Sequence, residues 1–92
     1  MQINATLMGG ERPRSFILSG RVGQTLKHLF DVGPAGLTPL DMPASRLSAY
    51  VHSLRKLGFE ITTEREEHGG DYPGHHARYR LESPVTLSEV AK

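Results

Sequence analysis

Small, polar and basic side chains recur at helical spacing between residues 45 and 56. When each residue advances by about 100°, Ser45, Ser48, Ala49 and His52 fall on one side, and longer basic side chains flank them. Small residues allow a close approach, hydroxyl and imidazole groups can bond to base edges, and basic groups can pair with phosphates. A helix that enters the major groove of DNA needs this combination, although an ordinary solvated helix face has a similar composition. The residues that we assign to DNA contact in this element are Ser45, Arg46, Ser48, Ala49, His52, Ser53, Arg55 and Lys56.

Three histidines, His68, His75 and His76, surround one glycine-rich loop, where Asp71 or Glu67 could add an oxygen ligand for a metal ion. Adjacent histidines on a strand point to opposite faces, however, and the spacing matches no closed zinc motif. A glycine-rich loop also preorganises ligands poorly. We therefore expect solvated histidines, no metal and no cofactor.

Signatures of catalysis are missing from the sequence. No serine, aspartate or histidine falls in a nucleophile motif, no phosphate-cradling glycine loop occurs, and no pair of carboxylates can be placed in a cleft. Cysteine is absent, which excludes disulfides, thiolate metal sites and a cysteine nucleophile. We expect a protein that is not an enzyme and has no small-molecule substrate.

The charge of the chain is nearly balanced, but its distribution is uneven. A net charge of +1 is far from the strongly basic balance of many DNA-binding domains. No acidic residue occurs between Asp41 and Glu60, whereas Arg46, Arg55 and Lys56 fall in that gap. Any basic surface should therefore be confined to one element.

The composition is that of one folded domain. The 92 residues suffice for one modest core, and 37% hydrophobic with 23% charged residues argue against disorder. The first residues lack a basic start followed by an apolar run, and no stretch approaches the ~18 apolar residues of a membrane span. We expect a cytoplasmic protein with no membrane partner.

The periodicity of the first third predicts strands and then a helix. Apolar residues alternate in the first segment, and Ser15–Leu18 is an apolar run; the breakers at 9–13 permit either a hairpin or a loose arm before a single strand. A 3.6-residue pattern then predicts a helix over residues 21–32, which Gly33-Pro34-Ala35-Gly36 terminates.

Two further helices are expected. Thr38-Pro39-Leu40-Asp41 resembles a capping box and predicts a short helix, which Pro43 must end. A third helix is predicted over residues 44–57, ended by Gly58. Its core face comprises Leu47, Tyr50, Val51, Leu54 and Leu57, and we expect Leu47, Val51 and Leu54 to pack on Leu26, Leu29 and Phe30 of the first helix.

Residues 59–66 and 77–82 alternate with a period of two around a loop rich in glycine and proline, which predicts a hairpin. One register brings opposite charges together, and those pairs would occupy both arginines of the second strand. The pairs expected are Glu67 with Ala77, Glu66 with Arg78, Arg65 with Tyr79, Glu64 with Arg80 and Thr63 with Leu81.

The hairpin loop is a second candidate contact. We assign Tyr72, His75 and Arg78 to the binding surface, and we expect residues 68–76 to be mobile in the free protein. The tail, residues 84–92, is expected to form at most one short helical turn without a role.

The predicted order, an optional strand or hairpin, three helices and a two-stranded hairpin, is an α+β winged helix-turn-helix arrangement. Residues 1–20 are then an N-terminal segment, 21–83 the domain and 84–92 a tail. The chain resembles small bacterial winged helix domains, which are often stand-alone proteins and are in some cases linked to phages. The residues that carry the resemblance lie within 22–84, namely Gly36-Leu37-Thr38-Pro39-Leu40-Asp41, Arg46 to Arg55, Gly58-Phe59-Glu60-Ile61-Thr62-Thr63 and His75 to Leu81.

The resemblance implies binding of double-stranded DNA by a small transcriptional regulator or accessory protein. Winged helices also serve as protein-interaction or assembly modules, so that alternative stays open. A homodimer is compatible both with DNA binding and with a role as a protein-interaction module.

Overall fold

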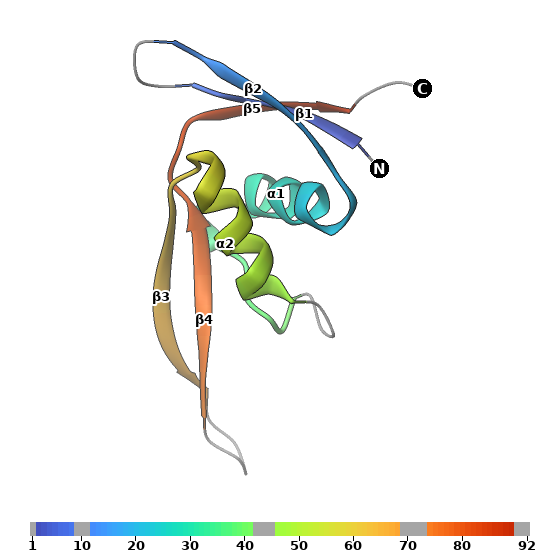
Figure 1. Cartoon of the computed structure of the whole chain (residues 1–92). Helices are drawn as coiled ribbons and strands as arrows, with labels where there is room; N and C mark the ends of the chain where they lie inside the picture. The colour runs from blue at the N-terminus through green and yellow to red at the C-terminus, as the bar shows by residue number, and fades with distance from the viewer. Residues whose placement is uncertain (1, 9–11, 42–45, 69–73, 90–92) are drawn as a thin grey trace.

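The computed structural model describes residues 2–8, 12–41, 46–68 and 74–89. Within these ranges the chain forms two α-helices, one short 3₁₀ helix and five strands (Figure 1). In chain order the elements are β1 (Gln2–Leu7), β2 (Arg14–Ser19), α1 (Gly20–Val32), the 3₁₀ helix η1 (Gly33–Ala35), α2 (Leu47–Leu57), β3 (Ile61–His68), β4 (Gly74–Leu81) and β5 (Val85–Glu89).

The N-terminal segment is a hairpin. β1 and β2 pair antiparallel without interruption from Gln2 opposite Ser19 to Leu7 opposite Arg14. Of the two readings of this segment, the hairpin is confirmed and the loose arm is wrong. The inner face of the hairpin, which includes Ala5 and Leu18, belongs to the main core.

The C-terminal tail completes this sheet. β5 pairs with β1 along the edge that β2 leaves open, so the strand order is β2-β1-β5. The prediction of a helical turn in the tail was wrong, because half-buried Val85 and Leu87 alternate with exposed Thr86 and Ser88 as a strand requires. Five alternating residues form a stable strand only when a neighbouring strand is present to pair with them.

Helix α1 packs beneath the sheet, and the predicted helix over 21–32 is confirmed. A Cβ atom on Gly23 would lie 2.9 Å from the carbonyl oxygen of Leu18, so the helix and β2 approach too closely for a side chain there. Leu26 and Leu29 are fully buried, as expected. Phe30 was expected beside them in the core, but it is 45% exposed because it lies on the flank of α1.

The predicted second helix is not formed over the residues that the structure describes. Thr38 to Asp41 make a turn in which the Thr38 N–H and hydroxyl both donate to the Asp41 carboxylate, at 2.9 and 3.1 Å. The capping interaction is therefore present, but no helix follows it through Asp41. Leu40 is 69% exposed, and a helix this short needs an apolar face packed on a neighbour. Residues 42–45 lie outside the described ranges.

Helix α2 provides the other half of the helical core. Leu47, Val51 and Leu54 are buried in the same cluster as Leu26 and Leu29, which confirms the predicted packing between the helices. Tyr50 and Leu57, also predicted on this face, are half-buried. Gly58 ends the helix in the left-handed conformation, with φ of 110°.

Strands β3 and β4 form a hairpin, called the wing hairpin below, that projects away from the three-stranded sheet (Figure 1). Its predicted register was wrong by two residues, since Glu66 faces His76 and Glu64 faces Arg78. A shift of two residues keeps every side chain on its expected face. A third segment ties β4 to the body of the domain, because Leu37 exchanges both backbone hydrogen bonds with Tyr79, at 2.8 Å each.

Candidate nucleic-acid interface

The outward face of α2 gathers most of the predicted contact residues. Ser48, His52, Ser53 and Lys56 are exposed, and Ala49 is half-buried between them. Ser53 donates its hydroxyl to the Ala49 carbonyl at 3.2 Å, so it is directed along the helix. The face offers a small, partly polar centre with a basic residue near the C-terminal end of the helix. Ser45 lies outside the described residues.

Arg46 stands at the N-terminal end of the same helix. Its carbonyl accepts the N–H groups of Ala49 and Tyr50, which anchors the backbone, while its side chain is exposed. Within the described ranges neither Arg46 nor Lys56 forms an ion pair or a side-chain hydrogen bond. Both cations are therefore available to a ligand, one at each end of α2.

Arg55 was assigned to DNA contact from the sequence, but in the structure its guanidinium group bonds to strand β3. Its Nε and Nη2 atoms donate to the Ile61 carbonyl at 3.0 and 2.6 Å, and Nη2 also donates to the Thr63 hydroxyl at 2.6 Å. These bonds join the last turn of α2 to β3. Arg55 thus positions the wing hairpin against the helix, and its donors are turned away from a ligand on the outward face.

The two faces of the wing hairpin carry different sets of charged residues. Thr63 bonds to Arg55, so the odd-numbered face of β3 is the one turned towards α2. Exposed Arg65 lies on this face, two residues further along the strand. Glu64 and Glu66 lie on the opposite face, whereas the position of Glu67 shares the face of Arg65 at the outer end of the strand.

Sequence reasoning missed Arg65 as a candidate contact. The predicted register placed it opposite Tyr79, whereas the structure pairs it with Ala77, beyond the buried base of the hairpin. The alternation of side chains along β3 could have identified it, because Arg65 lies an even number of residues from Ile61 and therefore on the same face. Ile61 is only 6% exposed and packs that face on the core.

The far face of the wing hairpin is a closed network of charges around Glu66. Arg78 Nε lies 2.7 Å from Glu66 Oε2, and His76 Nε2 lies 3.0 Å from Oε1. The hydrogen bond from Arg78 is the main cause that lowers the pKa of Glu66 from 4.5 to about 2; burial opposes this shift, and the hydrogen bond from His76 adds to it. The same pair raises the pKa of Arg78.

Arg78 and Arg80 also bind the wing hairpin to η1. Arg78 Nη1 donates to the Ala35 carbonyl at 2.8 Å, and Arg80 Nε donates to the Pro34 carbonyl at 2.9 Å. The expected ion pairs of Arg78 with Glu66 and of Arg80 with Glu64, the latter at 3.4 Å, do form, although as diagonal rather than directly opposite neighbours. The structure does not bring Arg78, a predicted contact residue, to the α2 side.

The predicted contacts at the end of the wing hairpin are only partly described. Tyr72 and the centre of the loop predicted to be mobile lie outside the described residues. His75 lies in β4, where its backbone is opposite Glu67. Among the described residues no three histidine, aspartate or glutamate side chains form a group that could hold a metal ion.

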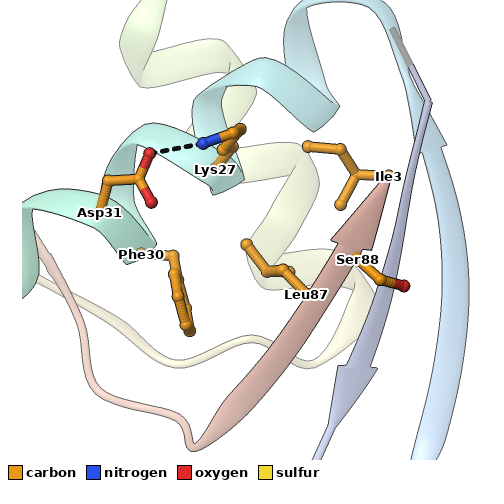
Figure 2. Close-up of a pocket in the computed structure, with 6 residues that line it drawn as sticks. All are labelled: Ile3, Lys27, Phe30, Asp31, Leu87 and Ser88. Atoms are coloured by element: carbon orange, nitrogen blue, oxygen red, sulfur yellow. Dashed lines mark hydrogen bonds and ion pairs between the residues drawn. The ribbon is translucent and has the colours of Figure 1, made fainter. Parts of the chain in front are cut away.

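A hollow of about 150 Å³ opens between α1 and the sheet. Ile3, Phe30 and Leu87 are its apolar lining residues, and Lys27 beside them pairs with Asp31 at 2.7 Å (Figure 2). Its lining comes from α1, β1 and β5, so it is separate from the outward face of α2.

Among the described residues no helix has the length and apolar character needed to cross a membrane.

Neither the curated proteins nor the solved structures compared with this chain include a significant match. A family model described as a winged helix domain does match, over residues 15–91. This range contains both helices, the wing hairpin with its Leu37 bridge, and β5. The chain therefore belongs to the winged helix domain family.

Proposed function

We propose that this protein is a non-catalytic DNA-binding module that acts as a small transcriptional regulator or accessory DNA-binding protein. In this proposal α2 enters the major groove of double-stranded DNA. Membership of the winged helix domain family supports the class of function, because winged helix domains are generally DNA-binding.

The observation that carries the proposal is the separation of charge around α2. Arg46 and Lys56 are exposed and unpaired within the described ranges, and α2 contains no acidic residue. Arg65 adds a third cation on the neighbouring face of β3, where Glu67 follows it two residues further from the base, and Glu64 and Glu66 face the other way. A chain of net charge +1 can thus present a locally basic surface to phosphates.

Each part of this surface has a distinct role in the proposal. Ser48, Ala49 and His52 lie at the centre, where small side chains let the helix approach the base edges. Arg46, Lys56 and Arg65 lie at the margins, where long side chains reach the phosphates. Arg55 holds the wing hairpin against α2 and Arg78 holds it against η1, because each donates to a backbone carbonyl.

Fluorescence anisotropy with a labelled random duplex, measured over a series of salt concentrations, tests the proposal. The Ala49→Glu variant should weaken binding by about tenfold or more, because it adds bulk and a negative charge where the groove must approach. Thr86→Glu is the matched control: it makes the same change in net charge at an exposed position on the outer face of the three-stranded sheet. Circular dichroism verifies that both variants fold.

Binding that is steep in salt and is lost only in Ala49→Glu supports the proposal. Equal affinity of a folded Ala49→Glu variant and the parent chain contradicts it. Absence of duplex binding at low salt would instead favour the protein-interaction alternative, whose interface depends weakly on salt.

A further inference from the structure

Strand β2 forms an edge of the three-stranded sheet that the described residues leave open. It pairs with β1 along one side, and no described strand pairs with the other. Proteins usually protect such edges with charges, bulges or proline within the strand. The charge of β2 is at its first residue, Arg14, which donates to the Leu57 carbonyl at 2.6 Å. Ser15 to Ser19 contain none of these protecting features, and the ladder to β1 runs without a bulge. Ile17, at the centre, is 67% exposed.

The last five residues of β2 are self-complementary. In Ser15-Phe16-Ile17-Leu18-Ser19, an antiparallel pairing centred on Ile17 places Ile17 opposite its own copy. Phe16 then faces Leu18 on the core side, and Ser15 faces Ser19 on the outer side. A two-fold axis requires one surface to complement itself, and here apolar residues meet apolar residues and hydroxyls meet hydroxyls.

The outer face of the sheet is also free of charge. The eight residues on this face are polar and uncharged apart from Ile17, and they are Gln2, Asn4, Thr6, Ser15, Ile17, Ser19, Thr86 and Ser88. Such a surface offers no attraction to a nucleic acid or a charged peptide. A second copy meets no like-charge repulsion there, which favours the same chain as the partner.

The opposite edge of the sheet lacks this symmetry. The same pairing of β5, centred on Leu87, would place Val85 opposite Glu89 and thus oppose a carboxylate to an apolar side chain. Burial of an unpaired charge is unfavourable. The self-complementary edge is therefore β2.

We infer that this protein forms a two-fold symmetric dimer through antiparallel pairing of β2 with β2 of a second copy. The product is one continuous six-stranded sheet in which the two Ile17 side chains meet on the axis. This inference does not depend on DNA binding, because it concerns the sheet and not the outward face of α2.

Sedimentation equilibrium of the full chain tests the dimer, with Ile17→Lys as the disrupting variant and Thr86→Lys as its control. Both variants add one positive charge at exposed positions of the same sheet face. Ile17→Lys should raise the dimer dissociation constant by about a hundredfold, because two isoleucines lose their mutual burial and two ammonium groups are opposed. Thr86→Lys should leave it unchanged. A parent chain that stays monomeric at millimolar concentration, or a dimer equally strong in Ile17→Lys, overturns the inference.

Cross-linking gives a second readout that does not rely on disruption. The chain has no cysteine, so Ile17→Cys introduces a single thiol on the axis, where directly opposite Cβ atoms lie about 4.5–5.5 Å apart. Mild oxidation should give a covalent dimer of Ile17→Cys and little of Thr86→Cys. Equal cross-linking of the two variants would contradict pairing through β2.

Discussion

The arginines of this protein show how one residue type performs different tasks according to its neighbours. Arg55 and Arg78 donate to backbone carbonyls and to side chains of the wing hairpin, and they join elements of the fold. Arg46 and Arg65 are exposed, and no bond of either side chain occurs among the described residues. Only the second kind can exchange its hydration for a phosphate without breaking an internal bond.

Arg55→Ala should therefore affect stability first. The variant leaves the Ile61 carbonyl and Thr63 hydroxyl without their donor, and we expect a loss of about 1–2 kcal/mol in the free energy of unfolding. Urea denaturation measures this loss. Lys56→Ala, the adjacent exposed cation without such bonds, should change the free energy by less than about 0.5 kcal/mol. Equal stability of the two variants would refute the assigned role of Arg55.

Lys56→Ala and His52→Ala should separate phosphate contact from base contact. If Lys56 binds a phosphate, its loss weakens binding to all duplexes alike and lowers the slope of log affinity against log salt by about one unit. His52→Ala should instead alter the preference between duplexes of different sequence. Anisotropy with a panel of duplexes at several salt concentrations measures both effects. A sequence-dependent loss in Lys56→Ala would contradict the assignment.

Glu66 should make the wing hairpin sensitive to acid. The pKa of its carboxyl falls from 4.5 to about 2 on folding, mainly through the hydrogen bond from Arg78. The stabilisation is thus complete above pH 4.5 and is lost as the pH falls towards 2. Thermal melts should show that the melting temperature of the parent chain falls between pH 5 and pH 2. The fall should be smaller in the Glu66→Gln variant. An identical decline in that variant would show that other carboxyl groups are responsible.

At the scale of elements, the contact between α1 and α2 supports the candidate interface. Leu54 is fully buried in the cluster with Leu26 and Leu29. Leu54→Ala should cost about 2–5 kcal/mol, through lost transfer energy and a residual cavity. Such a loss is a large part of the stability of a small domain. Urea denaturation is the measurement, and Leu40→Ala is the control because Leu40 is 69% exposed.

At the scale of the whole molecule, the C-terminal strand β5 completes the three-stranded sheet. β5 covers the edge of β1 from Ile3 to Leu7 and contributes half-buried Val85 and Leu87. A chain that ends after Pro84 should lose about 2–4 kcal/mol in unfolding free energy, because it loses both this apolar burial and the strand ladder. A chain that ends after Glu89 retains the strand and serves as the control. Unchanged stability of the shorter chain would contradict this role of β5.

The amino-acid sequence by itself determined the features that depend on local patterns. The 3.6-residue period and the following glycines predicted α1 and α2 within one to three residues of their observed bounds, as well as the buried stripe of Leu47, Val51 and Leu54. Alternation also predicted the faces of the wing hairpin, because side-chain parity survives a two-residue error in register. The candidate surface on α2 followed from the same periodicity.

Only the tertiary structure decided the features that depend on partners distant in the chain. Leu37 pairs with Tyr79 and ties β4 to the body of the domain, residues 85–89 pair with β1 as a strand, and Ile61 and Thr63 of β3 accept hydrogen bonds from Arg55. In each case one residue has several local options of similar energy, and a contact made across the chain selects among them.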